Sequence, residues 1–272
     1  MKEKYRELYK DSETQEEAFK RLVDIIRILR KECPWDKVQT HESLKRGMIE
    51  EAYEAVDAIN NNDMENLKEE LGDVLLQVVF HGVLSEEEKA FEIRDIINSE
   101  CNKMIRRHPH IFSTENIKSI DKLVEKWENI KSREHGEHCY TDRLKDVPSA
   151  LPALLRSEKV QKRAADAGFD WDDAEGAFDK LEEEAQELRD ACSEGNQESV
   201  NEEFGDLLFS MVNVSRFLGV NPEESLNGCT AKFIQRFEYM EKAALQSGRS
   251  LDDMKLAEMD ELWEEAKLKL KK

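Results

Sequence analysis

Two acidic motifs, EExxE and ExxD, stand close together in the stretch Met48–Phe80. Glu51 and Glu54 belong to the first motif, and Glu70 and Asp73 belong to the second, with fifteen residues between the motifs. On an α-helix, residues three and four apart share a face, so the two acids of each motif project together. Like charges at this spacing cost stability, but carboxylate oxygens without histidine or cysteine are suitable ligands for Mg²⁺ or Mn²⁺. The spacing therefore suggests a metal site.

The same pattern recurs 133 residues later along the chain. "GMIEEAYEAV…LKEELGDVLLQVV" at Gly47–Val79 corresponds to "KLEEEAQELR…VNEEFGDLLFSMV" at Lys180–Val212. The four acids keep their register and become Glu184, Glu187, Glu203 and Asp206. With 61 acids in the chain, one such motif alone is typical of a solvated surface. Its repetition in register, each time next to a strongly apolar segment, favours a metal site in both copies.

Basic and aromatic residues repeat as well. "NKMIRR" and "AKFIQR" align Lys103 with Lys232 and Arg107 with Arg236, and "EKWENIK" and "ELWEEAK" align Trp127 with Trp263. The basic residues could hold phosphate oxygens or form salt bridges. The tryptophans could stack on a nucleobase or fill the core. These residues alone do not decide between the alternatives.

Composition predicts the fold that must position these residues. Glycine and proline are scarce, at 11 and 5 of 272 residues, and no period-two strand pattern of useful length occurs. We expect an all-α fold of two tandem helical-bundle domains, residues 1–134 and 151–272, joined by a linker at 135–150. The helices expected in the first domain are Gln15–Lys31, His41–Asn60, Met64–Leu84, Glu86–Arg106 and Asp121–Arg133.

The two acidic helices of each copy should form an antiparallel hairpin, because only a short polar turn separates them. The helix that carries ExxD in the first copy is apolar almost all round. Such a helix must be covered on several sides, and each copy has few other apolar helices. We therefore expect dimerisation to complete the bundles.

The strongly negative net charge limits the classes of molecule that the protein can bind. The formal net charge of −20 argues against nucleic acid, which needs a concentrated basic face. It does not exclude a phosphorylated small molecule bound through metal ions. The beginning of the sequence lacks the apolar core of a signal peptide, and no run of eighteen apolar residues occurs. We expect a cytoplasmic protein with no membrane partner.

Taken in order, these motifs resemble the MazG nucleoside triphosphate pyrophosphohydrolases over nearly the whole chain. The likeness includes "CPWDKVQTHESL", both acidic hairpins, "RRHPHIF", "ALPALLRSEKVQKRAADAGFDW" and "KFIQRF…ELWEEAK". It implies tandem all-α MazG domains, a homodimer, and Mg²⁺-dependent hydrolysis of NTPs or dNTPs to the monophosphate and pyrophosphate. It also implies that the second copy is the better candidate for activity.

The resemblance assigns roles to individual residues of the second copy. Metal ligands fall on Glu184, Glu187, Glu203 and Asp206, and substrate contacts fall on Lys180, Lys232, Arg236 and Trp263. The first copy keeps its four acids but has Gly47 where the second has Lys180. One departure affects the second copy: the resemblance implies a lysine just before the ExxD motif, in the stretch where this chain has Ser199 and Val200. That departure leaves the number of phosphate contacts open.

We expect Glu183 or Glu184 to accept a proton from the attacking water. Two other functions stay open at this point. The protein could be a narrow pyrophosphatase for one nucleotide such as dUTP or dCTP. It could also be a non-enzymatic helical regulatory protein whose acidic sites bind metal.

Overall fold

The computed structural model describes residues 3–113, 119, 123, 127 and 139–270, and these form helices and connecting turns without a strand. The all-α prediction is confirmed over this part of the chain. The chain divides into two compact units, Met1–Ile130 and Lys131–Lys272, close to the predicted linker. None of the helices in the described ranges is long and apolar enough to cross a membrane.

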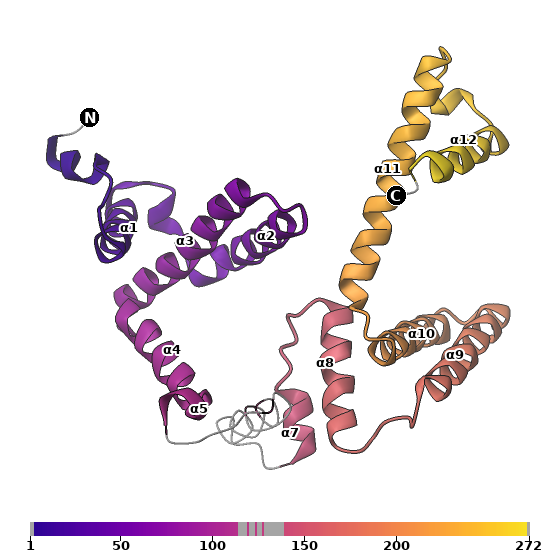
Figure 1. The fold of residues 1–272 in the computed structure, drawn as a ribbon, viewed down its shortest axis with the longest axis horizontal. Helices are drawn as coiled ribbons and strands as arrows, with labels where there is room; N and C mark the ends of the chain where they lie inside the picture. Colours follow the sequence, from indigo (N-terminus) through magenta and orange to yellow (C-terminus); the bar gives the residue numbers. More distant parts are fainter. Residues whose placement is uncertain (1–2, 114–118, 120–122, 124–126, 128–138, 271–272) are drawn as a thin grey trace. The chain divides into compact units, whose positions relative to one another are not determined.

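The first unit is built around one long antiparallel hairpin, α2 with α3 (Figure 1). Helix α1 packs against α3. The elements of the first unit are η1 (Glu3–Tyr9), α1 (Gln15–Glu32), η2 (Asp36–Val38), α2 (His41–Asn60), α3 (Met64–Glu88), α4 (Ile93–Arg107) and α5 (Pro109–Phe112). The buried core gathers on the carboxy-terminal half of α3, around Val79, Phe80 and Val83. The acidic half of α3 therefore lies beyond the core of its own unit.

Local capping fixes the turn of this hairpin. Asn62 takes the left-handed conformation, with φ of 55°, and reverses the chain. The Asp63 side chain then accepts a hydrogen bond from the Asn66 backbone N–H at 3.1 Å and starts α3. In the second unit Gly195, with φ of 72°, and the N-cap Asn196 do the same between α9 and α10. Both turns bring their acidic motifs face to face.

The helix expected to begin at Glu86 is misplaced. Helix α3 continues through Glu88 and ends only at Lys89, whose φ of 59° breaks the helix, and α4 begins at Ile93. The extra turn is held by ion pairs to α1, Arg27 with Glu86 at 2.8 Å and Arg30 with Glu87 at 2.6 Å. These long-range pairs override the local expectation. The helix expected at Asp121–Arg133 lies outside the described residues, apart from positions 123 and 127, which are helical.

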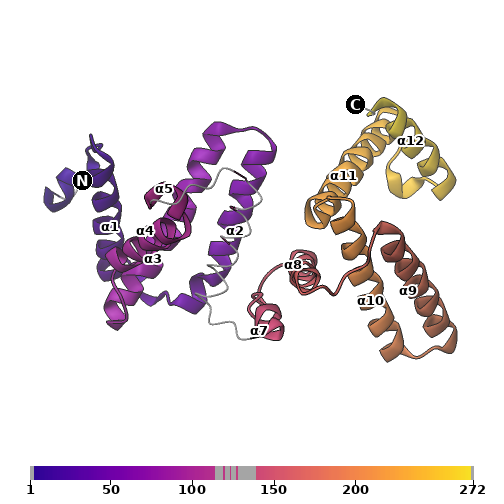
Figure 2. The ribbon, with the colours of Figure 1, turned by 60° about the horizontal axis from the view of Figure 1, so that its bottom comes forward.

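The second unit repeats the hairpin as α9 with α10, and α8 packs against α10 (Figures 1 and 2). Helix α12 returns along α11. The elements are α7 (Tyr140–Lys145), α8 (Ala153–Asp166), α9 (Ala174–Glu194), α10 (Gln197–Phe217), α11 (Pro222–Gln246), η3 (Leu251–Asp253) and α12 (Leu256–Lys269). The short helix α7 occupies part of the stretch that was expected to be a linker.

A charged turn sets the return of α12 along α11. Arg249 donates to Glu258 at 2.7 Å and to the Asp253 carbonyl at 2.9 Å. The Glu258 carboxylate also accepts the Lys255 backbone N–H at 2.9 Å. The Arg249 guanidinium, followed by this backbone bond, lowers the pKa of Glu258 from 4.5 to about 2. The ionised carboxylate therefore stabilises the turn.

Glu258→Gln should lower the melting temperature at pH 7 by roughly 1–3 °C, because the pair is partly exposed. A lowered pKa adds stability above the ordinary value and loses it as the pH falls towards the folded value. The difference from wild type should therefore shrink as the pH falls from 4.5 to about 2. Circular dichroism melts can measure it, with Glu261→Gln on the same helix as the control. Equal losses in both variants would contradict the assignment.

Candidate functional site

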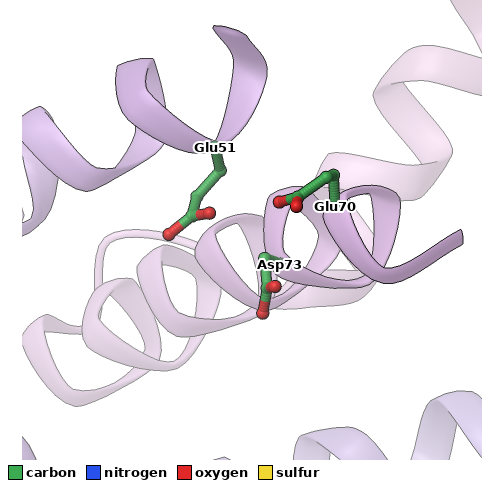
Figure 3. A group of neighbouring side chains, drawn as sticks. All are labelled: Glu51, Glu70 and Asp73. Carbon is green, nitrogen blue, oxygen red and sulfur yellow. The ribbon is translucent and has the colours of Figure 1, made fainter. Parts of the chain in front are cut away.

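The predicted acids of the first copy meet across the hairpin. Glu51 on α2 and Glu70 and Asp73 on α3 offer carboxylate oxygens that all lie within 4.8 Å of one another. Figure 3 shows the Glu51 side chain reaching from its helix towards the other two. Glu70 is buried, and Glu51 and Asp73 are partly buried. The hairpin thus gathers the carboxylates into one cluster.

The second copy builds a similar cluster. Glu184 and Glu187 on α9 and Glu203 on α10 have oxygens within 4.8 Å of one another, and Glu184 is buried. The fourth acid of each copy, Glu54 or Asp206, falls outside this group of mutual distances. Both still act on the cluster electrostatically, Glu54 on Glu70 and Asp206 on Glu203.

The carboxylates of each cluster destabilise one another's charged form. Burial raises the pKa of Glu70, and the charge and hydrogen bond of Glu54 raise it further. Burial first, and then neighbouring acids, likewise raise the pKa of Glu51, Glu187 and Glu203. At neutral pH the metal-free clusters therefore hold charges that the fold itself disfavours.

A divalent cation fits these donor sets. Every member of the two clusters is a carboxylate, and neither cluster includes histidine or cysteine. Hard oxygen donors of this kind select Mg²⁺ or Mn²⁺ over zinc or copper. The positive charge would also offset the burial and the repulsion that raise these pKa values.

A lysine distinguishes the second cluster from the first. The Lys180 ammonium lies 2.8 Å from Glu183 and 2.8 Å from Glu184, and these two carboxylates raise the pKa of the lysine. Gly47 takes this place in the first copy, and the side chain of Gln77 lies beside it. The position of Gln77 beside this cluster could not be predicted from the sequence, because nothing in its spacing distinguishes it from a core residue.

The other predicted substrate contacts gather on α11 and α12. The Arg236 guanidinium lies over the Trp263 ring at 5.5 Å from its centre, and Phe233 packs against the same ring at 5.0 Å. Lys232 lies one helical turn before Arg236 on α11, and its side chain is exposed. Among the described residues, no hydrogen bond or ion pair joins these side chains to the acidic cluster. In the first copy the matching pair also forms, with Arg107 over Trp127 at 5.7 Å.

A hollow of about 270 Å³ lies between α8, α10 and the loop that enters α9. Aromatic side chains of Phe169, Trp171 and Phe209 line it, together with Gln161 and Asn213. Gln161 is 93% buried, and its amide donates to the Phe209 carbonyl at 2.7 Å. Its Oε1 atom is buried without a hydrogen-bond partner. This hollow could not be predicted from the sequence, because its residues are scattered over three elements.

Comparison with known protein families decides the relationship. The MazG nucleotide pyrophosphohydrolase domain matches residues 39–112 and 174–240, more than half of the chain. The chain belongs to the MazG nucleotide pyrophosphohydrolase family. Each matched segment contains one acidic hairpin, so the resemblance drawn from the motifs and the tandem arrangement are both confirmed. As a MazG protein, the chain is an enzyme that acts on phosphoanhydride bonds.

Two relatives extend the match over most of the chain. A Thermotoga maritima protein named nucleoside triphosphate pyrophosphohydrolase/pyrophosphatase MazG is 45% identical over 251 residues, 92% of this chain and 95% of the relative. An Escherichia coli K12 protein named nucleoside triphosphate pyrophosphohydrolase is 38% identical over 237 residues, 86% of this chain and 90% of the relative. Both alignments are long enough to include the two copies.

Glu70→Gln should stabilise the metal-free MazG protein at pH 7.5, raising the melting temperature by about 1–3 °C. The raised pKa of Glu70 means that stability falls as the pH rises through it, and a neutral isostere removes that loss. The gain should therefore shrink towards pH 4.5, where wild-type Glu70 becomes protonated. Melts in EDTA can measure it.

Glu69→Gln is the matched control, because it removes the same charge from the exposed neighbouring position. Glu70→Gln should also reduce the stabilisation that added Mg²⁺ produces in wild type. If Glu70→Gln melts lower than Glu69→Gln in EDTA, the repulsion inferred for the cluster is wrong.

Proposed function

We propose that this MazG protein hydrolyses nucleoside and deoxynucleoside triphosphates to the monophosphate and pyrophosphate, with Mg²⁺ and broad base specificity. The observation that carries the proposal is the second-copy cluster, where carboxylates for a hard cation adjoin a lysine suited to phosphate oxygens. The activity named for the Thermotoga and Escherichia relatives supports the same reaction.

The second copy is the proposed catalytic copy. Its cluster combines Glu184, Glu187 and Glu203 with the ammonium of Lys180, whereas Gly47 offers the first cluster no charge. A triphosphate carries several negative charges, so a site made only of carboxylates and metal holds it less well. The first copy is proposed to bind metal and to contribute little turnover.

Each residue of the second copy has a separate proposed task. Glu184, Glu187, Glu203 and Asp206 would hold the metal. When bound, Mg²⁺ supplies positive charge against the phosphates and lowers the pKa of a bound water. Glu183 is the better candidate for accepting the water's proton, since it is exposed and lies outside the metal-binding group, whereas Glu184 is buried within it.

Lys180, Lys232 and Arg236 are proposed to neutralise phosphate oxygens. Trp263 would hold Arg236 in place, since the guanidinium lies over its ring. Because no hydrogen bond or ion pair joins α11 or α12 to the acidic cluster among the residues that the structure describes, we propose that substrate binding or a second subunit brings them together.

The hollow beside α10 is proposed to receive the nucleobase. Asn213 follows Asp206 by seven residues, which places it on the same helix face and about 10 Å further along. That separation suits the base of a nucleotide whose phosphates lie at the acids. Aromatic walls stack on any base, which supports broad rather than narrow specificity.

A homodimer is also proposed, because apolar residues are exposed at equivalent positions of α3 and α10. Leu71, Leu75 and Val78 form an apolar stripe on α3, and Phe204, Leu208 and Met211 form the equivalent stripe on α10. Leu71 and Phe204 are each 54% exposed. A second subunit on these stripes would complete the bundles and keep the stripes from water.

Purified protein with Mg²⁺ and each of the eight common NTPs and dNTPs should release pyrophosphate. ³¹P NMR separates this product from orthophosphate, and EDTA should stop its formation. Release of orthophosphate alone would overturn the pyrophosphohydrolase proposal. Turnover of only dUTP or dCTP would favour a narrow enzyme, and no turnover would favour a regulatory metal-binding protein.

Leu71→Glu with Phe204→Glu should convert the dimer to a monomer, because both changes place a charge in the proposed interface. Sedimentation velocity gives the mass in solution directly. Val38→Glu, at an apolar residue that is 71% exposed on η2 and outside both stripes, is the control and should stay dimeric. A wild-type chain that sediments as a monomer would rule out the homodimer.

A further inference from the structure

The two copies differ in the side chain that lies beside one pair of equivalent acids, Glu51 in the first copy and Glu184 in the second. In the second copy the Lys180 ammonium is 2.8 Å from Glu184, a buried acid of the cluster. It is also 2.8 Å from Glu183, which lies outside the cluster. One ammonium thus already lies against a carboxylate that a metal ion would use.

A neutral amide takes this role in the first copy. The equivalent of Lys180 is Gly47, and a Cβ at that position would lie 2.9 Å from the amide nitrogen of Gln77. The Gln77 side chain counteracts the raised pKa of Glu51, the counterpart of Glu184, and its Oε1 is buried without a partner. The residue that corresponds to Gln77 in the second copy is Ser210, which is too short to reach as far.

The neighbouring cation does not replace the missing lysine. Arg46 precedes Gly47, but its side chain is 87% exposed and pairs with Glu50 at 2.6 Å. The two copies therefore differ at two linked positions. The second copy combines Lys180 with Ser210, and the first combines Gly47 with Gln77. Within the part of the chain that the structure describes, an ammonium partly neutralises the second cluster, and no ion pair neutralises the first.

An ammonium and a divalent cation compete when both need the same carboxylate oxygens. From this juxtaposition we infer that Lys180 is an internal counter-ion that must leave Glu184 before the second copy binds its metal. A triphosphate offers Lys180 other oxygens, so metal and nucleotide enter this copy cooperatively, while the first copy binds metal without nucleotide. The nucleotide part of this inference rests on the proposed function; the competition between Lys180 and metal does not.

Mn²⁺ titration by isothermal calorimetry, without nucleotide, tests the competition in the full chain. Glu51→Gln with Glu70→Gln removes the first cluster, so that only the second is measured. In that background Lys180→Met should tighten Mn²⁺ binding about two- to fivefold, the range expected for a partly exposed ion pair. Lys180→Arg should bind like its parent, because it keeps the charge.

Lys159→Met is the control for the loss of one positive charge, since Lys159 is exposed on α8. It should leave the affinity unchanged. Unchanged or weaker Mn²⁺ binding in Lys180→Met, with a circular dichroism spectrum like wild type, would overturn the counter-ion role. Equal tightening in Lys159→Met would also overturn it, since that result reports only net charge.

The reverse exchange tests the first copy. In a chain whose second cluster is removed by Glu187→Gln and Glu203→Gln, Gly47→Lys with Gln77→Ser should weaken Mn²⁺ binding by a similar factor. Both changes are needed, because a side chain at 47 would meet Gln77. Gln77→Ser alone separates the effect of the lost amide, and equal affinity in the double exchange and in Gln77→Ser would contradict the inference.

A non-hydrolysable triphosphate tests the cooperativity. It should tighten Mn²⁺ binding to the second copy more in the parent chain than in Lys180→Met, because coupling between two ligands is reciprocal. Equal tightening would overturn the proposed departure of Lys180. If wild type releases no pyrophosphate, the proposed function fails, yet the titrations without nucleotide still decide the competition.

Discussion

Mutual repulsion among carboxylates held on two antiparallel helices is the constraint on which the rest of this structure depends. Each cluster brings three acids within 4.8 Å and partly excludes water from them. Their raised pKa values show that the metal-free fold disfavours the charges it carries. Such an arrangement persists only where other contacts hold the hairpin together. Carboxylates with raised pKa values are typical of functional sites.

The remaining elements provide those means. Capped turns at Asp63 and Asn196 set the register of the two hairpins, so that the EExxE and ExxD motifs face each other. In the first unit, ion pairs from α1 and a core around Val79 hold the far half of α3. The stability of the hairpin therefore comes from residues beyond the acids, and the acidic end is left available to a cation.

The sequence allowed the hairpins and the acid clusters to be predicted, because both depend on local spacing that repeats in two copies. The end of α3 at Lys89 was not predictable, since it is decided by ion pairs to residues almost sixty positions away. Gln77 and Gln161 were missed for a related reason: a single amide has no periodicity, and only the packing shows what it touches. The separation of Arg236 and Trp263 from the acids likewise depends on how α11 leaves α10. Roles for these residues rest on the family resemblance rather than on contacts within one chain.

Duplication has produced two hairpins of one design that differ in the residue beside the metal-binding acids, Gly47 in the first copy and Lys180 in the second. The central claim is that this difference places turnover in the second copy. The most direct measurement is pyrophosphate release by two full-length variants, Glu70→Gln and Glu203→Gln, at saturating Mg²⁺ and nucleotide. We expect Glu203→Gln to lose at least about a hundredfold in kcat, as loss of a metal ligand implies, and Glu70→Gln to keep most of the wild-type rate. Full activity in Glu203→Gln with loss in Glu70→Gln would contradict catalysis by the second copy.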